Sequence, residues 1–240
     1  MIIIPARLGS TRFPKKVLAD IGGTPMVVAT ANAVQSVDNV AVATDSKEVL
    51  EVCESYNIKA VMTSSEHKSG TDRINEAAAR LGLDDSEIII NVQADEPFIE
   101  PEIVEKLKQL VEVSKNDNRI MICSAYKAIS KEDAKDPNIV KVITDESGFA
   151  IYFSRSMIPY DRDGEFDSYK GHLGLYGFTR KMLEKFCNLP HAPLEHIEKL
   201  EQLRALSHGY AIAMTEVKTE SFGIDTPEDL KRATNYFNRS

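Results

Sequence analysis

The sequence predicts an α/β fold with a mostly parallel sheet, followed by a second lobe of mixed α+β structure. In the first half, short runs rich in Val and Ile alternate with segments of helical periodicity, which is typical of βαβ units. In the second half, predicted strands follow one another with a hairpin-type turn at 146–148. No linker-like segment separates the halves. We therefore predict one domain over residues 1–240, with lobes at 1–117 and 118–224 and a closing helix at 225–240 that returns to the first lobe.

The first lobe is expected to contain four strands, each followed by a helix. Residues 2–4 are a continuous apolar run that suits a strand buried on both faces, and Pro5 ends it because proline lacks a backbone N–H. Thr24 is expected to cap the first helix, with Pro25 at the first helical position. The expected strands are 2–4, 40–44, 59–62 and 87–92, and the expected helices are 24–37, 45–56, 71–82 and 101–113.

The second lobe is expected to contain five strands and two helices, and the closing helix follows it. The segment 156–170 contains Pro159, Gly164 and many charged residues, so it is the best candidate for a mobile loop. The expected strands are 119–126, 139–144, 149–153, 171–178 and 211–217, and the expected helices are 179–187, 194–206 and 226–238.

The predicted helix at 194–206 has an apolar stripe at helical spacing, which indicates core packing or a subunit interface. The stripe consists of Leu194, Ile197, Leu200 and Leu203. The simplest interpretation of Glu195, Glu198 and Glu201 is a solvated face with Glu–Lys pairing.

Composition excludes several classes of protein. The 240 residues carry a net charge of −8 and a pI near 5.3, so a general nucleic-acid binder is not expected. Cys53, Cys123 and Cys187 are far apart and odd in number, which indicates reduced thiols. No segment approaches the roughly 20 apolar residues of a membrane span, and no signal peptide is evident. We expect a cytoplasmic protein that binds neither nucleic acid nor a membrane.

A basic loop follows the first strand, where open α/β sheets bind their ligands. Gly9 allows close approach of the backbone to a ligand, and Arg and Lys side chains suit phosphate oxygens. The pattern predicts a polyphosphate cradle, although a solvated basic loop is the alternative. Neither of the usual glycine-rich nucleotide loops is present. The loop contains Arg7, Gly9, Ser10, Thr11, Arg12, Lys15 and Lys16.

Two carboxylates are candidate metal ligands. Asp95 follows a buried strand, at the same sheet edge as the basic loop, and Mg²⁺ takes one or two protein carboxylates together with phosphate oxygens. Asp225 precedes a helix whose start is better explained by Thr226 as cap, Pro227 and the capping-box acid Asp229. Asp225 is then free to bind a metal. An ordinary acidic loop at Asp95, and Asp225 as the cap, are the structural alternatives.

Two further patterns suggest ligand contacts. Ser69 and Arg73 lie at a predicted helix N-terminus, whose N–H groups could contact a base or an anion, although a plain cap is the default. His172 and Tyr176 share one face of a strand that also contains Gly171, Gly174 and Gly177. The glycines open space beside the two rings, so a substrate contact is as good an explanation as a structural histidine.

Taken together, these stretches resemble the 3-deoxy-manno-octulosonate (Kdo) cytidylyltransferases, also called CMP-Kdo synthetases, of the sugar nucleotidyltransferase superfamily. The resemblance runs nearly end to end, and the motifs from Tyr152 onward point to the Kdo branch. The matching stretches are 3–7, 10–12, 67–73, 91–97, 152–155, 172–176, 193–204 and 225–230.

The resemblance implies a nucleotide-diphospho-sugar transferase-like three-layer sandwich. It implies that CTP and Kdo give CMP-Kdo and pyrophosphate with Mg²⁺, for lipopolysaccharide synthesis in a Gram-negative cytoplasm, and that the chain forms a homodimer through its second lobe. No Ser/His/Asp relay or nucleophilic cysteine is evident, so direct in-line transfer is expected. The alternatives are CMP transfer to another acidic keto-sugar, such as 8-amino-Kdo or a sialic-type sugar, and a non-catalytic nucleotide-binding regulator.

The resemblance also assigns roles to individual residues. The catalytic set is Arg12, Lys16, Asp95 and Asp225. The nucleotide-binding set is Arg7, Ser10, Arg12, Lys16, Ser69, Arg73 and Gln93. The sugar-binding set is Arg155, His172, Tyr176, Glu201 and Gln202, and the metal ligands are Asp95 and Asp225. The chain departs from the family pattern at three positions: Lys15 and Ala94 stand where glycine is common, and Tyr160 where Trp is expected.

Overall fold

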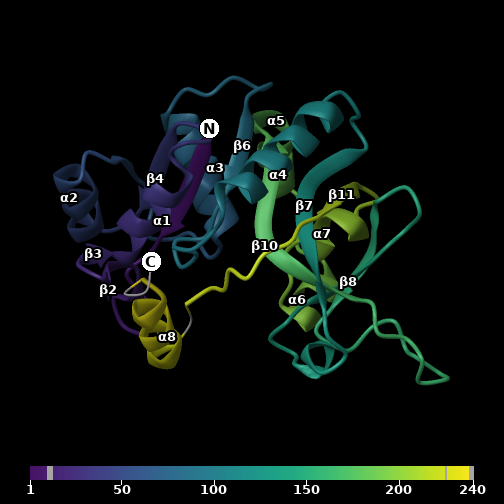
Figure 1. Ribbon diagram of the computed structural model, residues 1–240. Helices are drawn as coiled ribbons and strands as arrows, with labels where there is room; N and C mark the ends of the chain where they lie inside the picture. The colour runs from purple at the N-terminus through teal and green to yellow at the C-terminus, as the bar shows by residue number, and fades with distance from the viewer. Residues whose placement is uncertain (10–12, 225, 238–240) are drawn as a thin grey trace. The chain divides into compact units, whose positions relative to one another are not determined.

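The computed structural model describes residues 1–9, 13–224 and 226–237. Ser10, Thr11, Arg12 and Asp225 lie outside the described residues, as do 238–240. The chain forms two compact units, shown in Figure 1: unit 1 comprises Met1–Glu105 and Glu220–Ser240, and unit 2 comprises Lys106–Thr219. Among the described residues, no helix combines the length and the apolar character needed to cross a membrane.

Unit 1 contains a parallel sheet in the order β6, β1, β4, β5, as the alternating pattern predicted. The apolar side chains of residues 2–4 in β1 are completely buried, as expected for a central strand covered on both faces. Pro5 does not end β1. It lies where β1 pairs with β4 alone, so its missing N–H interrupts no ladder with β6. The strands are β1 (Ile2–Ala6), β4 (Val40–Thr44), β5 (Lys59–Met62) and β6 (Ile88–Asn91).

The order of these strands determines where the helices cross. The chain moves outward from β1 to β4 and β5, and then returns past β1 to β6. Because crossovers are right-handed, the two outward helices cover one face of the sheet and the returning helix covers the other. The strand order reverses between β1 and β6, so the loops after these two strands border the ligand crevice expected at such a switch point. The helices are α1 (Met26–Val34), α2 (Lys47–Ser55) and α3 (Gly70–Arg80).

The start of α1 differs from the prediction. Thr24 and Pro25 form the short strand β3 (Thr24–Pro25), which pairs with β2 (Asp20–Ile21), and the helix begins at Met26. The Met26 N–H donates to the carbonyl of Ala19 at 2.9 Å. Because the backbone satisfies this donor, no hydroxyl cap is needed, and Thr24 does not act as one.

The last helix of the chain, α8 (Pro227–Phe237), belongs to unit 1. It lies beside β2, at the foot of the unit in Figure 1. Ala233 of α8 and the preceding Ile224 are both fully buried in a small apolar cluster with Ile21 and Met26. This packing anchors the segment that leads into α8.

Unit 2 is built on a long antiparallel pair, β7 with β10, which lie side by side in Figure 1. The strand β11 pairs with β7 in parallel, and β8 joins β10 to β9 by antiparallel pairing. The register between β7 and β10 shifts between Leu173 and Tyr176, which marks a β-bulge. The elements are α4 (Pro101–Ser114), which enters from unit 1, β7 (Ile120–Ile129), β8 (Lys141–Thr144), β9 (Ala150–Ser154), β10 (Tyr169–Thr179), α5 (Arg180–Cys187) and β11 (Ala211–Glu216).

The prediction of a single helix at 194–206 is wrong. Two short helices replace it, α6 (Pro193–Glu198) and α7 (Leu203–Ser207), because Lys199 adopts a left-handed conformation with φ 56° and ends α6. The carbonyl of Glu198 accepts a hydrogen bond from Arg155 Nε at 2.8 Å instead of continuing the helix. The apolar stripe is divided accordingly: Leu200 and Leu203 are buried, whereas Leu194 and Ile197 are exposed.

Candidate active site

The best-defined pair of predicted site residues is Lys16 and Asp95. Lys16 is the last residue of the basic loop after β1, and Asp95 follows β6, so both lie at the switch point of the unit 1 sheet. The distance between Lys16 Nζ and Asp95 Oδ2 is 2.5 Å, and both side chains are largely shielded from solvent. The structure therefore places a cation from the predicted phosphate loop against the predicted metal-binding carboxylate.

The segment before α8 runs alongside Asp95. The Ile224 N–H donates to the Asp95 carbonyl at 2.9 Å, and Ser221 Oγ donates to Glu96 Oε2 at 3.3 Å. Asp225 itself lies outside the described residues, so its role as a metal ligand stays a prediction. Ile224, the residue before Asp225, nevertheless donates a hydrogen bond to Asp95, the residue with which Asp225 is predicted to share a metal.

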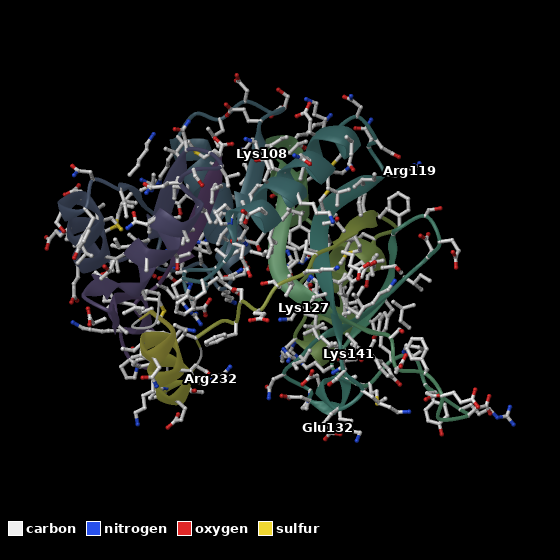
Figure 2. The ribbon with its side chains drawn as sticks, in the orientation of Figure 1. Lys108, Arg119, Lys127, Glu132, Lys141 and Arg232 are labelled. Carbon is white, nitrogen blue, oxygen red and sulfur yellow. The ribbon has the colours of Figure 1, made fainter. Side chains whose placement is uncertain are left out.

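The capping prediction for α8 is confirmed. The Asp229 N–H donates to Thr226 Oγ1 at 3.1 Å, and the Thr226 N–H donates to Asp229 Oδ2 at 3.0 Å. These two bonds form the reciprocal capping box expected for this helix start. Arg232, labelled on α8 in Figure 2, lies over the ring of Phe222 at 4.4 Å and fixes the segment further.

The N-terminus of α3 also lies at this edge of unit 1. Ser69 caps the helix by accepting a hydrogen bond from the Asp72 N–H at 3.0 Å. At Gly70, a Cβ atom would lie 3.1 Å from Pro5 Cγ and 3.9 Å from Gln93 Oε1. A Cβ atom here would be crowded against Pro5, so glycine favours the close approach of α3 to the end of β1, which brings Ser69 and Gln93 to the switch point.

Arg73 is buried and bonded inside unit 1. Its guanidinium donates to Asp45 Oδ2 and Thr63 Oγ1, each at 2.7 Å, and to the Ser64 carbonyl at 3.2 Å. These bonds tie the segment after β5 to the end of β4. The predicted contact between Arg73 and the nucleotide stays a prediction, and Asp45 is a partner that the sequence did not reveal.

Glu76 lies one turn after Arg73 and binds the same segment. It accepts from the Ser64 N–H at 2.8 Å and contacts His67 Nε2 at 2.5 Å. Burial opposes the charged form of Glu76, but hydrogen bonds from Ser64, His67 and Arg80 outweigh it and lower the pKa of Glu76 to about 2. The loop 63–69 is thus fixed at two points on α3.

The rest of the basic loop is less fully described. Arg7 is exposed, whereas Ser10 and Arg12 lie outside the described residues. Lys15 adopts a left-handed conformation with φ 55°, and its ammonium contacts both carboxylate oxygens of Glu48 at 2.8 Å. This left-handed conformation explains why glycine is suited to position 15 in the family that the sequence resembles.

In unit 2, the structure brings three predicted sugar-binding residues together. The ring centroids of His172 and Tyr176 are 5.6 Å apart, which confirms that they share a face of β10. Tyr176 Oη donates to Gln202 Oε1 at 3.1 Å. Burial raises the pKa of Tyr176, and the charge of Glu201 adds to the effect. Within the described part of the chain, Gln202 Nε2 is buried without a hydrogen-bond partner.

Arg155 lies in a separate network of unit 2. Its backbone N–H donates to Glu198 Oε2 at 3.0 Å, its Nε to the Glu198 carbonyl, and its Nη1 to the Pro137 carbonyl at 3.0 Å. Glu198 also accepts from Ser154 Oγ, so it is not on a solvated face as expected. Glu195 is likewise bound, to Arg204 at 2.5 Å.

Lys141 supports Arg155 from within the unit. Its side chain, labelled in Figure 2, is completely buried, and burial lowers the pKa of Lys141. Its ammonium donates to three backbone carbonyls, those of Asp136, Ile139 and Arg155. All three ammonium protons are used in this way, which is how the buried charge is tolerated.

Two of the three cysteines, Cys53 and Cys123, do not provide a nucleophile. Burial raises the pKa of Cys53 to about 11 and that of Cys123 to about 12, so both thiols stay protonated. Among the described residues, no group of three or more His, Cys, Asp or Glu side chains is suited to a metal. Mg²⁺ needs fewer protein ligands than this when a nucleotide supplies oxygens, and the hard carboxylate of Asp95 fits that requirement.

Comparison with known proteins decides the family. A family model described as cytidylyltransferase matches residues 1–217. The 3-deoxy-manno-octulosonate cytidylyltransferase of a Nitratiruptor species is 59% identical over 99% of each chain, and that of Wolinella succinogenes is 54% identical over 100% of each. The chain belongs to the 3-deoxy-manno-octulosonate cytidylyltransferase family.

Solved structures agree with this family. A CMP:2-keto-3-deoxy-manno-octonic acid synthetase complexed with CTP matches with a TM-score of 0.90 and 38% identity, over 99% of this chain and 98% of that one. A cytidylyltransferase from Leptospira borgpetersenii matches with a TM-score of 0.63 at 19% identity, over 100% of this chain and 86% of that one, and so shows the fold alone. The predicted fold class, family and enzyme class are confirmed. The regulator and the other-sugar alternatives are not favoured.

Proposed function

We propose that this member of the Kdo cytidylyltransferase family transfers CMP from CTP to Kdo, releasing pyrophosphate, to supply lipopolysaccharide synthesis. The full-length match to relatives of that name supports the substrates. The contact between Lys16 and Asp95 at the switch point carries the chemical argument. A loop cation and a hard carboxylate at one sheet edge are what a nucleoside triphosphate and its metal require.

In this proposal, unit 1 binds CTP. Lys16, together with Arg7 and Arg12, donates to phosphate oxygens and stabilises the charge that develops on the leaving pyrophosphate. Asp95 and Asp225 would bind Mg²⁺, which would polarise the α-phosphate and acidify the attacking hydroxyl. Lys16 and Asp95 neutralise each other before substrate arrives, so neither charge is left without a partner in a shielded site.

Unit 2 binds the sugar acid. Arg155 is the proposed partner of its carboxylate, because Nε and Nη1 already bond to carbonyls and fix the plane of the guanidinium. His172, Tyr176 and Gln202 offer neutral groups for hydroxyls. The anomeric hydroxyl oxygen attacks the α-phosphorus in line, the bond from that phosphorus to the bridging oxygen breaks, and the proton passes to solvent. Catalysis rests on positioning and charge stabilisation.

A homodimer and a cytoplasmic location are part of this proposal. Ile151 on β9 and Ile197 on α6 are 58% and 73% exposed, which suits a subunit contact through unit 2. The free cysteines in the described chain suit a reducing compartment, where CTP is also available.

A pyrophosphate-release screen tests the reaction. Each of CTP, UTP, ATP and GTP is combined with Kdo, 8-amino-Kdo or N-acetylneuraminate, with and without Mg²⁺. We expect release with CTP and Kdo in the presence of Mg²⁺. Faster turnover of 8-amino-Kdo or N-acetylneuraminate would assign the chain to a sister reaction, and no release from any pair would contradict an enzymatic role.

Asp95→Asn tests the site itself. Loss of the carboxylate charge should lower kcat by about 10²-fold or more, because transition-state charge stabilisation is removed. Asp38→Asn is the matched control, since Asp38 pairs with the Met1 amine at 3.1 Å at the amino ends of β1 and β4, away from the carboxyl ends where Asp95 lies. Equal turnover in the two variants would remove Asp95 from the chemistry.

A further inference from the structure

Ser124 lies behind the predicted sugar-binding histidine. It is a residue of β7 with no exposed surface. Its Oγ is 2.8 Å from His172 Nε2, 2.7 Å from the Leu175 carbonyl oxygen and 3.4 Å from that of Leu173. The two carbonyls come from the bulge in β10, so this one hydroxyl connects the bulge to the imidazole.

The distances determine where the protons are. A hydroxyl oxygen and a carbonyl oxygen 2.7 Å apart need a proton between them, and only the hydroxyl can supply it. Ser124 has one proton to donate, so it donates to Leu175 and its lone pair faces His172. The Nε2 atom of His172 must therefore be the donor in the second hydrogen bond.

The remaining nitrogen of His172 is then defined as well. The residue keeps some solvent-accessible surface, but its surroundings are tightly packed, and this burial lowers the pKa of His172 to about 3. A neutral ring with a proton on Nε2 carries an acceptor at Nδ1. Nδ1 has no hydrogen-bond partner among the residues that the structure describes. The rings of Phe153 and Tyr176 flank the imidazole at centroid distances of 4.8 and 5.6 Å.

We propose that Ser124 is a positioning residue that keeps neutral His172 protonated on Nε2, so that Nδ1 accepts a hydrogen bond from a hydroxyl of the sugar substrate. The proposal rests on the proposed function and adds an atom-level role to the same site. A second, independent group complements it: Gln202 Nε2 is buried and unpartnered within the described chain, while Oε1 of the same amide accepts a hydrogen bond from Tyr176 Oη. The cluster thus presents an acceptor and a donor to hydroxyl groups.

The tautomer can be measured without substrate. In protein labelled with ¹⁵N-histidine, two-bond ¹H–¹⁵N correlations distinguish the Nε2–H form from the Nδ1–H form, and His172→Gln identifies the His172 signals among the five histidines. We expect wild type to show the Nε2–H form and Ser124→Ala to show a mixture. Ser114→Ala is the matched control, because it removes another buried hydroxyl of unit 2 that bonds to Cys123 and not to His172. An Nδ1–H form in wild type, or an unchanged Nε2–H form in Ser124→Ala, would overturn the proposal.

Kinetics connect the tautomer to the sugar. Ser124→Ala should raise the KM for Kdo about tenfold, the value of one hydrogen bond, with the KM for CTP unchanged. Ser114→Ala should change neither constant. Equal Kdo KM values in the two variants would overturn the sugar contact. If wild type turns over no sugar, the proposed reaction and the sugar contact both fail, while the NMR result still decides whether Ser124 controls the tautomer.

Discussion

The two units present opposite kinds of chemistry in their candidate sites. In unit 1, charged groups face charged groups: Lys16 contacts Asp95, and Arg73 contacts Asp45. In unit 2, the central contacts join neutral groups, as between Ser124 and His172. The difference matches the proposed ligands, since triphosphate and metal need formal charge whereas sugar hydroxyls need donors and acceptors in fixed directions.

The charged residues of unit 2 strengthen this contrast. Lys141 and Arg155 are both cations, yet the described bonds of their side-chain donors go to backbone carbonyls and not to carboxylates. They fix backbone segments around the neutral cluster. In this proposal the Lys16–Asp95 pair of unit 1 meets a ligand, whereas charge in unit 2 mainly stabilises the frame, apart from the guanidinium edge proposed for the sugar carboxylate.

The largest effect expected from this comparison is on stability at Arg73. Arg73→Met leaves Asp45 without its partner in a shielded position, which should lower the free energy of unfolding by about 3–5 kcal/mol. The matched control is Arg80→Met on the same helix, where an exposed pair with Glu76 contributes less than about 1 kcal/mol. Urea unfolding of both variants compares a buried charge with an exposed one. Similar losses would show that the Arg73 network is no stronger than a surface pair.

The sequence predicted the meeting of Lys16 and Asp95 because parallel strands bring their carboxyl ends to one edge, a rule that depends on topology alone. It could not predict that Arg73 points inward. Its partner Asp45 is 28 positions away, and a helix N-terminus offers the same residue type to a ligand or to the core. The prediction of one helix at 194–206 failed for a related reason. Arg155 donates to the carbonyl of Glu198, and the local sequence around Glu198 does not show that this distant residue will do so.

Protonation of His172 should produce a smaller, pH-dependent effect. The pKa of His172 is about 3 in the folded chain and about 6.5 in an unfolded one. Between these values the unfolded state binds one more proton, so stability is lost as pH falls from 6.5 towards 3, by up to about 1.4 kcal/mol per pH unit. His172→Gln should remove this contribution. Urea unfolding at pH 4.5, 5.5 and 6.5 should give a shallower dependence on pH for the variant than for wild type.

The control for this measurement is His196→Gln, because His196 is exposed on α6. The free energy of unfolding of His196→Gln should depend on pH as that of wild type does. Glu76 and Asp117 are carboxylates whose folded pKa values lie near 2, so the stability they contribute is lost mainly below pH 4.5, outside the chosen range. If His172→Gln and His196→Gln gave the same slope, the neutral character assigned to the unit 2 cluster would be wrong.

The smallest effect concerns Lys15, at the border of the unit 1 site. Its φ of 55° is unfavourable for a residue with a Cβ atom, and its contact with Glu48 is exposed. Lys15→Gly and Lys15→Ala both remove the ion pair, so their difference isolates the backbone conformation. We expect the glycine variant to be about 1 kcal/mol more stable than the alanine variant. Thermal unfolding measures this difference.

The ion pair is tested by comparing Lys15→Ala with wild type. An exposed pair of this kind contributes less than about 1 kcal/mol, so Lys15→Ala should lose only a little stability, and Glu48→Gln should lose the same amount. Turnover in Lys15→Gly should stay at the wild-type level, because the lysine is bonded to Glu48 and not to the Lys16–Asp95 pair. A large fall in turnover with intact stability would instead show that Lys15 contacts the phosphates, and that the charged site of unit 1 extends one residue further along the basic loop.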